Sequence, residues 1–261
     1  MRYLLTLRFD GTNYHGWQVQ QNALAVQPVV QDALQRILQQ RPGVSGCSRT
    51  DSGVHANMYC CHFDVERELE PQRLTRALNF ALPKDIAVLS THRVSEEFHA
   101  RYSCTGKEYI YRFHNAPVRD PFEEGYSVHV HSLMDLERLN RAAAGYVGTH
   151  DFTTFCAARA KEGDPVRTVR RSECTRQGDM VVFSVEADGF LYNMVRIMAG
   201  TLLQVAFGRF SAEDIPRMLA ARDRSAAGPT APAQGLFLNR VFYEDFLTGE
   251  TARYHQEAEY V

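Results

Sequence analysis

The sequence predicts an α+β protein of two halves, each close to the ferredoxin-like order β-α-β-β-α-β, with antiparallel sheets and the catalytic cleft between the halves. Two observations support this prediction. Segments that alternate between apolar and polar residues are interleaved with segments of helical spacing, and the order of the segments is similar in the two halves of the chain. A length of 261 residues fits one or two domains.

The first half contains each element of this order. Apolar residues alternate over 3–9, which predicts a strand, and they follow helical spacing over 26–38, where a proline is tolerated in the first turn. Arg41-Pro42-Gly43 ends that helix. The remaining elements predicted for this half are a short strand at 44–48, a strand at 57–65, a helix at 71–82 and a strand at 86–94.

The second half follows the order β-α-β-β-α-α-β. A strand at 107–113 precedes a helix that follows the capping signal Ser132-Leu-Met-Asp135 and extends to Val147. The remaining predicted elements are strands at 166–175 and 180–187, helices at 190–207 and 211–221, and a strand at 236–243. The predicted domains are therefore 1–104, which carries the loop of Asp51, and 105–246, followed by an acidic tail at 247–261.

Composition excludes several classes of protein. No run of 18 uninterrupted apolar residues is present, which argues against a membrane span, and the N-terminus lacks the features of a signal peptide, so a cytoplasmic protein is expected. The six cysteines form no C-x-x-C pair, which fits reduced thiols. His129 and His131 would share a strand face without further ligands nearby, so we expect no metal site.

The formal net charge of −2 excludes a uniformly basic surface. Between residues 155 and 176, however, six basic residues outnumber three acidic ones. Such a stripe can bind phosphates, and it can equally be the solvated face of a loop and a strand. Loops at 115–125, 155–166 and 223–235 are further candidates for substrate contact.

The sharpest local signal is the glycine-bounded loop from Gly46 to Ala56, which contains Arg49 and Asp51. An aspartate beside an arginine has a lowered pKa, so Asp51 is predicted to be an ionised nucleophile. The alternative is a hairpin loop in which Asp51 caps its own backbone. Asp51-Ser-Gly53 also matches half of an aspartic-protease site, in which two aspartates share one proton. We reject this interpretation because the chain has no second D-[ST]-G and because the nearby arginine would lower the pKa of the shared proton.

Two other residues are candidates for the same site. Arg196 lies in a segment that is apolar nearly all round, and a buried guanidinium requires an anionic partner, either Asp51 or a structural acid. Tyr109 alternates with Tyr111 and Phe113 on a strand. Such an aromatic stripe forms core more often than a surface on which bases stack.

Blocks of sequence distributed over nearly the whole chain resemble one known family. They are FDGTNYHGWQ at 9–18, RTDSGVHA at 49–56, FHAR at 98–101, KEYIY at 107–111, GTHDF at 148–152, FLYNMVR at 190–196 and PAQGL at 232–236. In this order they resemble the TruA family of tRNA pseudouridine synthases. The chain departs from the common pattern in having Ser48 for glycine and Ser52 for alanine.

The resemblance implies a role for each candidate. Asp51 matches the family's catalytic aspartate, Arg49 the arginine that helps to flip the target base, Tyr109 the tyrosine that stacks on the uracil, and Arg196 the arginine that pairs with the aspartate. It also implies a homodimer without a cofactor that acts on the tRNA anticodon arm at positions 38, 39 and 40. The alternatives are a non-catalytic RNA-binding or chaperone protein on this fold, and a synthase for another RNA position.

Overall fold

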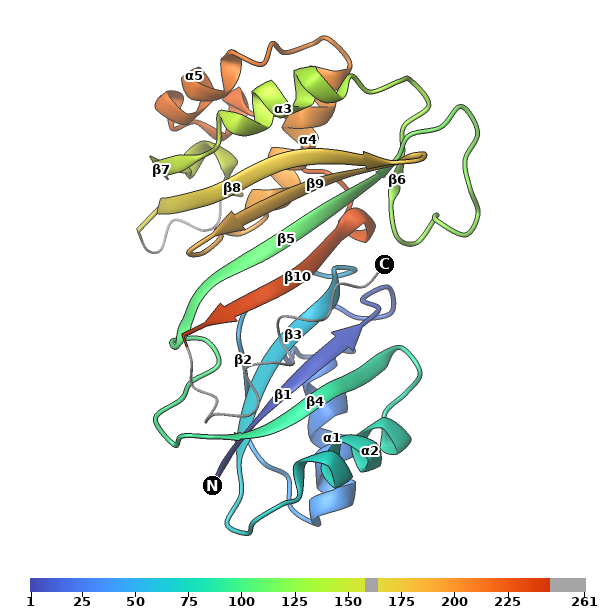
Figure 1. Cartoon of the computed structure of the whole chain (residues 1–261), viewed down its shortest axis with the longest axis vertical. Coiled ribbons are helices and arrows are strands. Elements are labelled where there is room, and N and C mark those ends of the chain that lie inside the picture. Colours follow the sequence, from blue (N-terminus) through green and yellow to red (C-terminus); the bar gives the residue numbers. More distant parts are fainter. Residues whose placement is uncertain (158–163, 245–261) are drawn as a thin grey trace. The chain divides into compact units, whose positions relative to one another are not determined.

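The computed structural model describes residues 1–157 and 164–244, which form a mixed α+β structure with mostly antiparallel strands (Figure 1). The predicted tail at 247–261 and part of the predicted loop at 155–166 lie outside the described residues. The chain divides into two compact units. The first comprises Met1–Thr50, Ala56–Thr105 and the chain from Val241; the second comprises Asp51–His55 and Gly106–Arg240.

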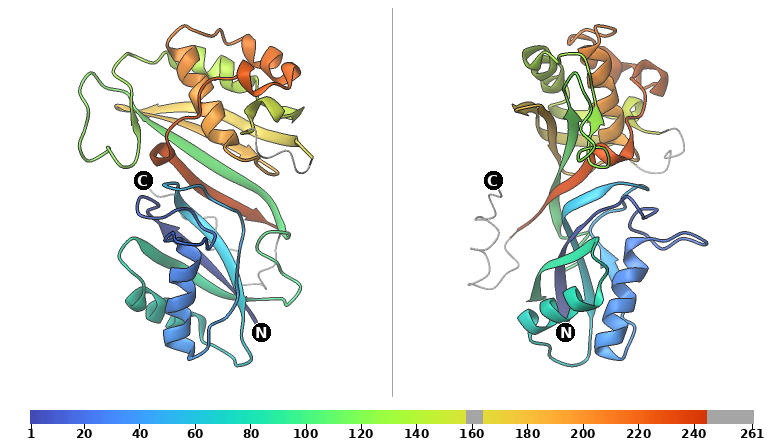
Figure 2. Two further views of the ribbon diagram at one scale, coloured as in Figure 1. Left: turned by 180° about the vertical axis from the view of Figure 1, so that it is seen from behind. Right: turned by 90° about the vertical axis from the view of Figure 1, so that its right-hand side faces the viewer.

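The first unit has the element order that its sequence predicts. Its elements are β1 (Arg2–Phe9), α1 (Val26–Leu38), β2 (Val44–Gly46), β3 (His55–Asp64), α2 (Pro71–Ala81) and β4 (Ile86–Val94). The strands are antiparallel and lie in the order β4-β1-β3-β2. Both helices lie on one face of these strands, as the view from behind shows (Figure 2).

Local sequence explains both helices. Most residues of α1 that its helical spacing predicts to face the core are buried, whereas Val29 and Ile37 are half-buried. Gln39 ends the helix in the left-handed region at φ 58°. In α2, Pro71 occupies the first turn, and the carboxylate of Glu70 accepts hydrogen bonds from the backbone N–H groups of Gln72 and Arg73. Leu74 and Leu78 then bury the inner face of α2.

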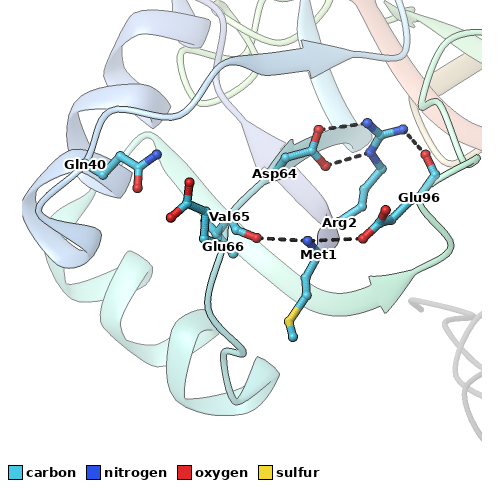
Figure 3. Close-up of a pocket in the computed structure, with 7 residues that line it drawn as sticks. All are labelled: Met1, Arg2, Gln40, Asp64, Val65, Glu66 and Glu96. Atoms are coloured by element: carbon cyan, nitrogen blue, oxygen red, sulfur yellow. Dashed lines mark hydrogen bonds and ion pairs between the residues drawn. The ribbon is translucent and has the colours of Figure 1, made fainter.

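The Arg2 guanidinium ties together three segments at one end of this sheet (Figure 3). Its Nε and Nη2 donate to the two carboxylate oxygens of Asp64, each at 2.8 Å. Its Nη1 donates to the backbone carbonyls of Glu96 and Phe98, both at 2.6 Å. The hydrogen bond from Arg2 lowers the pKa of Asp64. One side chain of β1 therefore fixes the end of β3 and the segment after β4.

The second unit contains more elements than its sequence predicts. They are β5 (Cys104–His114), β6 (Val128–His129), α3 (Leu136–Ala144), β7 (Gly148–Asp151), β8 (Val166–Gln177), β9 (Met180–Ala187), α4 (Met194–Ala206), α5 (Asp214–Ala221) and β10 (Leu236–Tyr243). The strands lie in the order β10-β5-β9-β8-β7, and β6 pairs with β5 in parallel. The predicted element order omits β6 and β7, which are too short to show a period, although the strand face expected for His129 falls on β6.

Several predicted helix boundaries in this unit are wrong by three or four residues. The helix predicted from 190 begins at Met194, because Asn193 adopts the left-handed conformation at φ 60°. The helix after Asp135 ends at Ala144, so it excludes Val147. The helix predicted from 211 begins at Asp214, whose carboxylate accepts a hydrogen bond from the Ser211 N–H at 2.8 Å. At these helix ends, local backbone conformation sets the boundary, whereas the predictions rested on the spacing of apolar residues.

The helix α4 is the buried centre of the second unit, as its apolar sequence predicts. Two glycines allow the segment 228–231 to lie directly against it. A Cβ at Gly200 would stand 1.8 Å from the carbonyl oxygen of Pro229, and a Cβ at Gly228 would stand 2.7 Å from the Cα of Thr201. The Thr201 hydroxyl also accepts a hydrogen bond from the Gly228 N–H at 2.9 Å. This close approach brings the backbone of Ala231 to the first turn of α4.

Among the helices of residues 1–157 and 164–244, none has the length and apolar character needed to cross a membrane.

Replacing Asp64 with asparagine is expected to lower the free energy of unfolding at pH 7 by about 1 kcal/mol, or the Tm by about 2–4 °C. The effect is modest because the Asp64 side chain is 58% exposed. Arg2 lowers the pKa of Asp64 in the folded state, so this stabilisation is present above the unfolded pKa and is lost as pH falls through the folded pKa. Thermal unfolding of Asp64→Asn and the wild type from pH 7 to pH 3 measures it. A difference in Tm that persists unchanged at pH 3 would contradict this account.

Candidate active site

The loop that carries Asp51 turns tightly and packs within the second unit. The N–H of Val54 donates to the Asp51 carbonyl at 3.2 Å, which closes the turn. Gly53 has φ +76°, a conformation that residues with a Cβ rarely adopt. A glycine is therefore required here by the backbone, and the turn presents the Asp51 carboxylate.

His55 anchors the end of this loop. Its side chain is buried, and its Nε2 lies 3.1 Å from the carbonyl oxygen of Gly125. Its ring stacks on Phe237 with centroids 4.6 Å apart, and it also contacts Tyr126 at 5.3 Å. These three contacts of the His55 ring therefore join the Asp51 loop to the segment before β6 and to β10.

Arg196 extends from the first turn of α4 and is held by the chain around it. Its Nε donates to the Ala231 carbonyl at 2.8 Å, and the Ala231 N–H donates to the Arg196 carbonyl at 3.0 Å. Its Nη1 donates to Oδ1 of Asn193 at 3.0 Å. These contacts fix both the backbone and the guanidinium of Arg196 before it meets any anion.

Asp51 is the carboxylate that Arg196 meets. The distance from Arg196 Nη1 to Asp51 Oδ2 is 3.5 Å, and both side chains are largely buried, with exposed fractions of 18% and 25%. The sequence left the anionic partner open between Asp51 and a structural acid. The structure identifies this partner as Asp51, which lies 145 residues before Arg196 in the sequence.

The pKa of Asp51 differs from the sequence-based expectation. The sequence predicts a lowered pKa for Asp51 because Arg49 is its neighbour. Instead, burial raises the pKa of Asp51 above its ordinary value, and the charge and hydrogen bond of Arg196 oppose that rise without cancelling it. The prediction was wrong because it considered a nearby charge and omitted the cost of removing the carboxylate from water.

Tyr109 and Tyr111 lie two residues apart on β5. Tyr109 is 6% exposed, and its ring meets Phe190 edge to face with centroids 5.0 Å apart. Tyr111 is fully buried, and its hydroxyl donates to the Pro232 carbonyl at 2.7 Å. Tyr111 therefore supports the segment that holds Arg196, and Tyr109 is itself buried in the core against Phe190.

Arg49 belongs to the first unit, and its side chain is exposed. The chain just before it is tightly constrained. A Cβ at Gly46 would stand 2.1 Å from the Tyr59 hydroxyl and 2.5 Å from Nε1 of Trp17. The rings of Tyr59 and Trp17 stack with centroids 4.1 Å apart, and Tyr59 donates to the Ser48 carbonyl. These contacts set where the chain leaves β2.

Four supporting groups at this site were not predicted. They are the carbonyl of Ala231, the side chain of Asn193, the hydroxyl of Tyr111 and the ring of His55. Asn193 carried a usable signal, because asparagine before a helix often adopts the left-handed conformation. The other three act through contacts between residues far apart in sequence, which no local pattern encodes.

The cationic stripe at 155–176 is largely satisfied within the protein. Arg170 lies 3.7 Å from Glu186, and Arg171 pairs with Glu108 and, at 3.0 Å, with Glu173. Arg176 donates to Asn115 at 2.7 Å. These contacts support the structural interpretation of the stripe for the residues described; Arg159 and Lys161 lie outside them.

No group of three or more histidine, cysteine, aspartate or glutamate side chains within residues 1–157 and 164–244 is arranged to hold a metal ion. The groups at the site that can take part in chemistry are a partly buried carboxylate and a guanidinium that favours its charged form. A carboxylate held in this way can act as a nucleophile or as a base.

Comparison with known proteins gives one family. A sequence model described as tRNA pseudouridine synthase matches residues 6–103 and 142–244. Arg49 and Asp51 lie in the first matched segment and Arg196 in the second, whereas Tyr109 lies between them.

Full-length relatives are similar over most of the chain. Each of the following is named tRNA pseudouridine synthase A. The protein of Ruminiclostridium cellulolyticum is 43% identical over 92% of this chain and 98% of its own length. That of Exiguobacterium sibiricum is 42% identical over 95% and 99%, and that of Halalkalibacterium halodurans 44% identical over 90% and 90%. A solved structure titled as a Cbf5-Nop10-Gar1 complex aligns at TM-score 0.33 and 12% identity, over 92% of this chain and 59% of that one, which is too weak to bear on fold or function.

Truncating Arg196 to alanine is expected to lower the free energy of unfolding by about 2–3 kcal/mol, because it leaves Asp51 without a counter-charge and the Ala231 carbonyl without its donor. Urea unfolding at pH 7 measures the change. Asp51→Asn is the matched control. It keeps a polar group for Arg196 and removes a carboxylate whose ionisation burial disfavours, so its loss should be smaller. An Arg196→Ala protein as stable as the wild type would show that the pair contributes nothing to the fold.

Proposed function

The chain belongs to the tRNA pseudouridine synthase family, and we infer that it is an isomerase that converts uridine to pseudouridine in tRNA. The observation that carries this inference is the pairing of Asp51 with Arg196 at 3.5 Å, between two segments that the family model matches. A largely buried carboxylate with a dedicated guanidinium is costly for a fold. RNA binding alone needs no such carboxylate, since RNA is itself an anion.

The reaction accounts for the residue types at the site. The N1–C1′ glycosidic bond breaks, the uracil turns, and a C5–C1′ bond forms while the hydrogen on C5 is released and N1 gains one. Atoms and electrons balance without an oxidant, a phosphate donor or a cofactor. Asp51 has two possible roles, attack on C1′ to form a covalent intermediate or removal of the C2′ proton to form a glycal. Both require the ionised carboxylate.

We assign the other site residues to supporting roles. Arg196 orients the carboxylate of Asp51 and favours its charged form, which the contact at 3.5 Å supports. Tyr109 stacks on the flipped uracil, returning about 1–3 kcal/mol of the cost of unstacking it. Its place on β5, two residues from Tyr111, whose hydroxyl donates to Pro232 beside the segment that holds Arg196, supports this role. Arg49 helps to extrude the target base, and its exposed side chain supports that role.

The family name specifies tRNA as the substrate but not which uridines are modified. We propose that the targets are uridines 38, 39 and 40 in the anticodon arm of tRNA, as the resemblance of the sequence blocks to the TruA family implies. The name of the full-length relatives, tRNA pseudouridine synthase A, is consistent with this proposal. We further propose a cytoplasmic homodimer that needs no cofactor.

The finer fold proposal is that each half is a variant of the ferredoxin-like fold, with domains at 1–104 and 105–246. The order of the strands supports the ferredoxin-like part of this proposal. Strand order is β4-β1-β3-β2 in the first unit, and the four strands β10-β5-β9-β8 of the second unit repeat that order. The five residues Asp51–His55 cluster with the second unit although they lie within the first proposed domain. The cleft between the halves stays a prediction.

The function is tested with tRNA transcripts whose uridines carry tritium at C5, because pseudouridine formation releases that hydrogen. We expect release by the wild type and at least a thousandfold less by Asp51→Ala and by Asp51→Asn, whose folding is checked by thermal unfolding. Mapping of the modified nucleotides then tests positions 38, 39 and 40.

Each other outcome has a distinct meaning. Release by the Asp51 variants at the wild-type rate would contradict the role of the carboxylate. A wild-type protein that binds the anticodon arm tightly but releases no tritium would contradict the enzyme proposal and favour a non-catalytic RNA-binding protein.

A further inference from the structure

A basic hollow lies on the outer side of the two helices of the first unit. The helices α1 and α2 run beside one another on the same face of the sheet (Figure 2). The hollow has a volume of about 670 Å³. It is lined by Arg36 and Ile37 of α1 and by Arg73, Arg76, Ala77, Phe80 and Ala81 of α2. We call this surface the α1–α2 arginine face.

The three guanidiniums of this face have no acidic partner among the residues that the structure describes. Within the described parts of the chain, neither Arg36, Arg73 nor Arg76 has a carboxylate oxygen within ion-pair distance of its guanidinium, and all three side chains are exposed. Several exposed arginines elsewhere are paired, for example Arg93 with Glu68 at 2.9 Å and Arg141 with Glu137 at 3.3 Å. Three like charges lining one hollow repel one another, so this arrangement favours an anionic ligand.

Acidic groups close in sequence are already engaged. Asp32 of α1 pairs with Arg41. Glu70 caps α2 by accepting two backbone N–H groups, at 2.9 and 2.6 Å, and Glu68 is held by Arg93. The positive charge of the face is therefore not neutralised by these neighbours.

Phe80 adds a flat apolar surface at the same place. It follows Arg76 by four residues, so the two side chains lie on one face of α2. Its side chain is 94% exposed, and Ile37 and Ala77 form the apolar floor beside it. An exposed aromatic ring next to unpaired guanidiniums is the combination that proteins use to bind RNA, with arginine on phosphates and the ring against a base.

We propose that the α1–α2 arginine face is a second RNA-binding surface, which binds the phosphodiester backbone of the substrate RNA through Arg36, Arg73 and Arg76 and stacks a base on Phe80. The proposal rests on the proposed function only in taking the substrate RNA as the ligand. RNA fits better than a protein partner because the face carries a single sign of charge and because guanidinium groups match phosphate geometry.

The test compares two matched double variants. Arg73→Ala/Arg76→Ala removes two unpaired arginines from the face. Arg141→Ala/Arg217→Ala removes two exposed helical arginines that each pair within their own helix, at 3.3 and 3.5 Å. Full-length tRNA is titrated with each protein at 50–300 mM KCl by filter binding, roughly the range in which phosphate contacts weaken. Tritium release is measured at saturating tRNA.

We expect the face variant to bind tRNA more weakly and its plot of log Kd against log salt to lose a slope of about one per arginine. The control variant should keep the wild-type slope. Because the face lies outside the catalytic residues, kcat at saturating tRNA should stay within about twofold of the wild type. Phe80→Leu should weaken binding about tenfold at an unchanged salt slope, whereas Phe80→Tyr, which keeps the ring, should bind as the wild type does.

An unchanged Kd and slope in the face variant would overturn the proposal. A shift in its elution volume on size exclusion, with unchanged tRNA binding, would also overturn it and assign the face to a protein contact. Failure of the proposed function is distinguishable. In that case the wild type releases no tritium, yet the salt slope still differs between the face variant and the control.

Discussion

The contact between Arg196 and Asp51 is the interaction on which the rest of the site depends. It joins residues 145 positions apart in the sequence. Two separate devices make it possible: Gly200 lets the segment ending at Ala231 lie against α4 and hold Arg196, and Gly53 turns the Asp51 loop toward it. The scaffold of the second unit therefore holds this charged pair in a position where both side chains are largely buried.

Burial and charge act against each other on this pair. Removal from water raises the pKa of Asp51, and Arg196 limits the rise. The same burial that makes the carboxylate costly for the fold strengthens its electrostatic interaction with a neighbouring charge, because less water remains to screen it. An exposed aspartate would cost the fold less free energy, and its electrostatic interactions would be weaker because water would screen them. The carboxylate is thus neither a simple surface acid nor a neutral core group.

Sequence alone predicted the elements with a clear period and the identity of the charged residues, but not how those residues are supported. The helix at 26–38 and the strand at 236–243 were predicted with the bounds that the structure has. The first residue of α4 was missed because the left-handed Asn193, and not hydrophobicity, sets it. The partner of Arg196 stayed open, and the pKa of Asp51 was predicted in the wrong direction, because both depend on burial by residues distant in sequence.

Titration of the Asp51 carboxyl group by carbon-13 NMR tests the central claim most directly. Resonances are assigned by their loss in Asp51→Asn and followed in the wild type and in Arg196→Gln. The account predicts a wild-type pKa above that of an exposed aspartate and a still higher pKa in Arg196→Gln, because burial remains while the opposing charge is gone. A pKa that is unchanged or lower in Arg196→Gln would show that Arg196 does not hold the charge of Asp51.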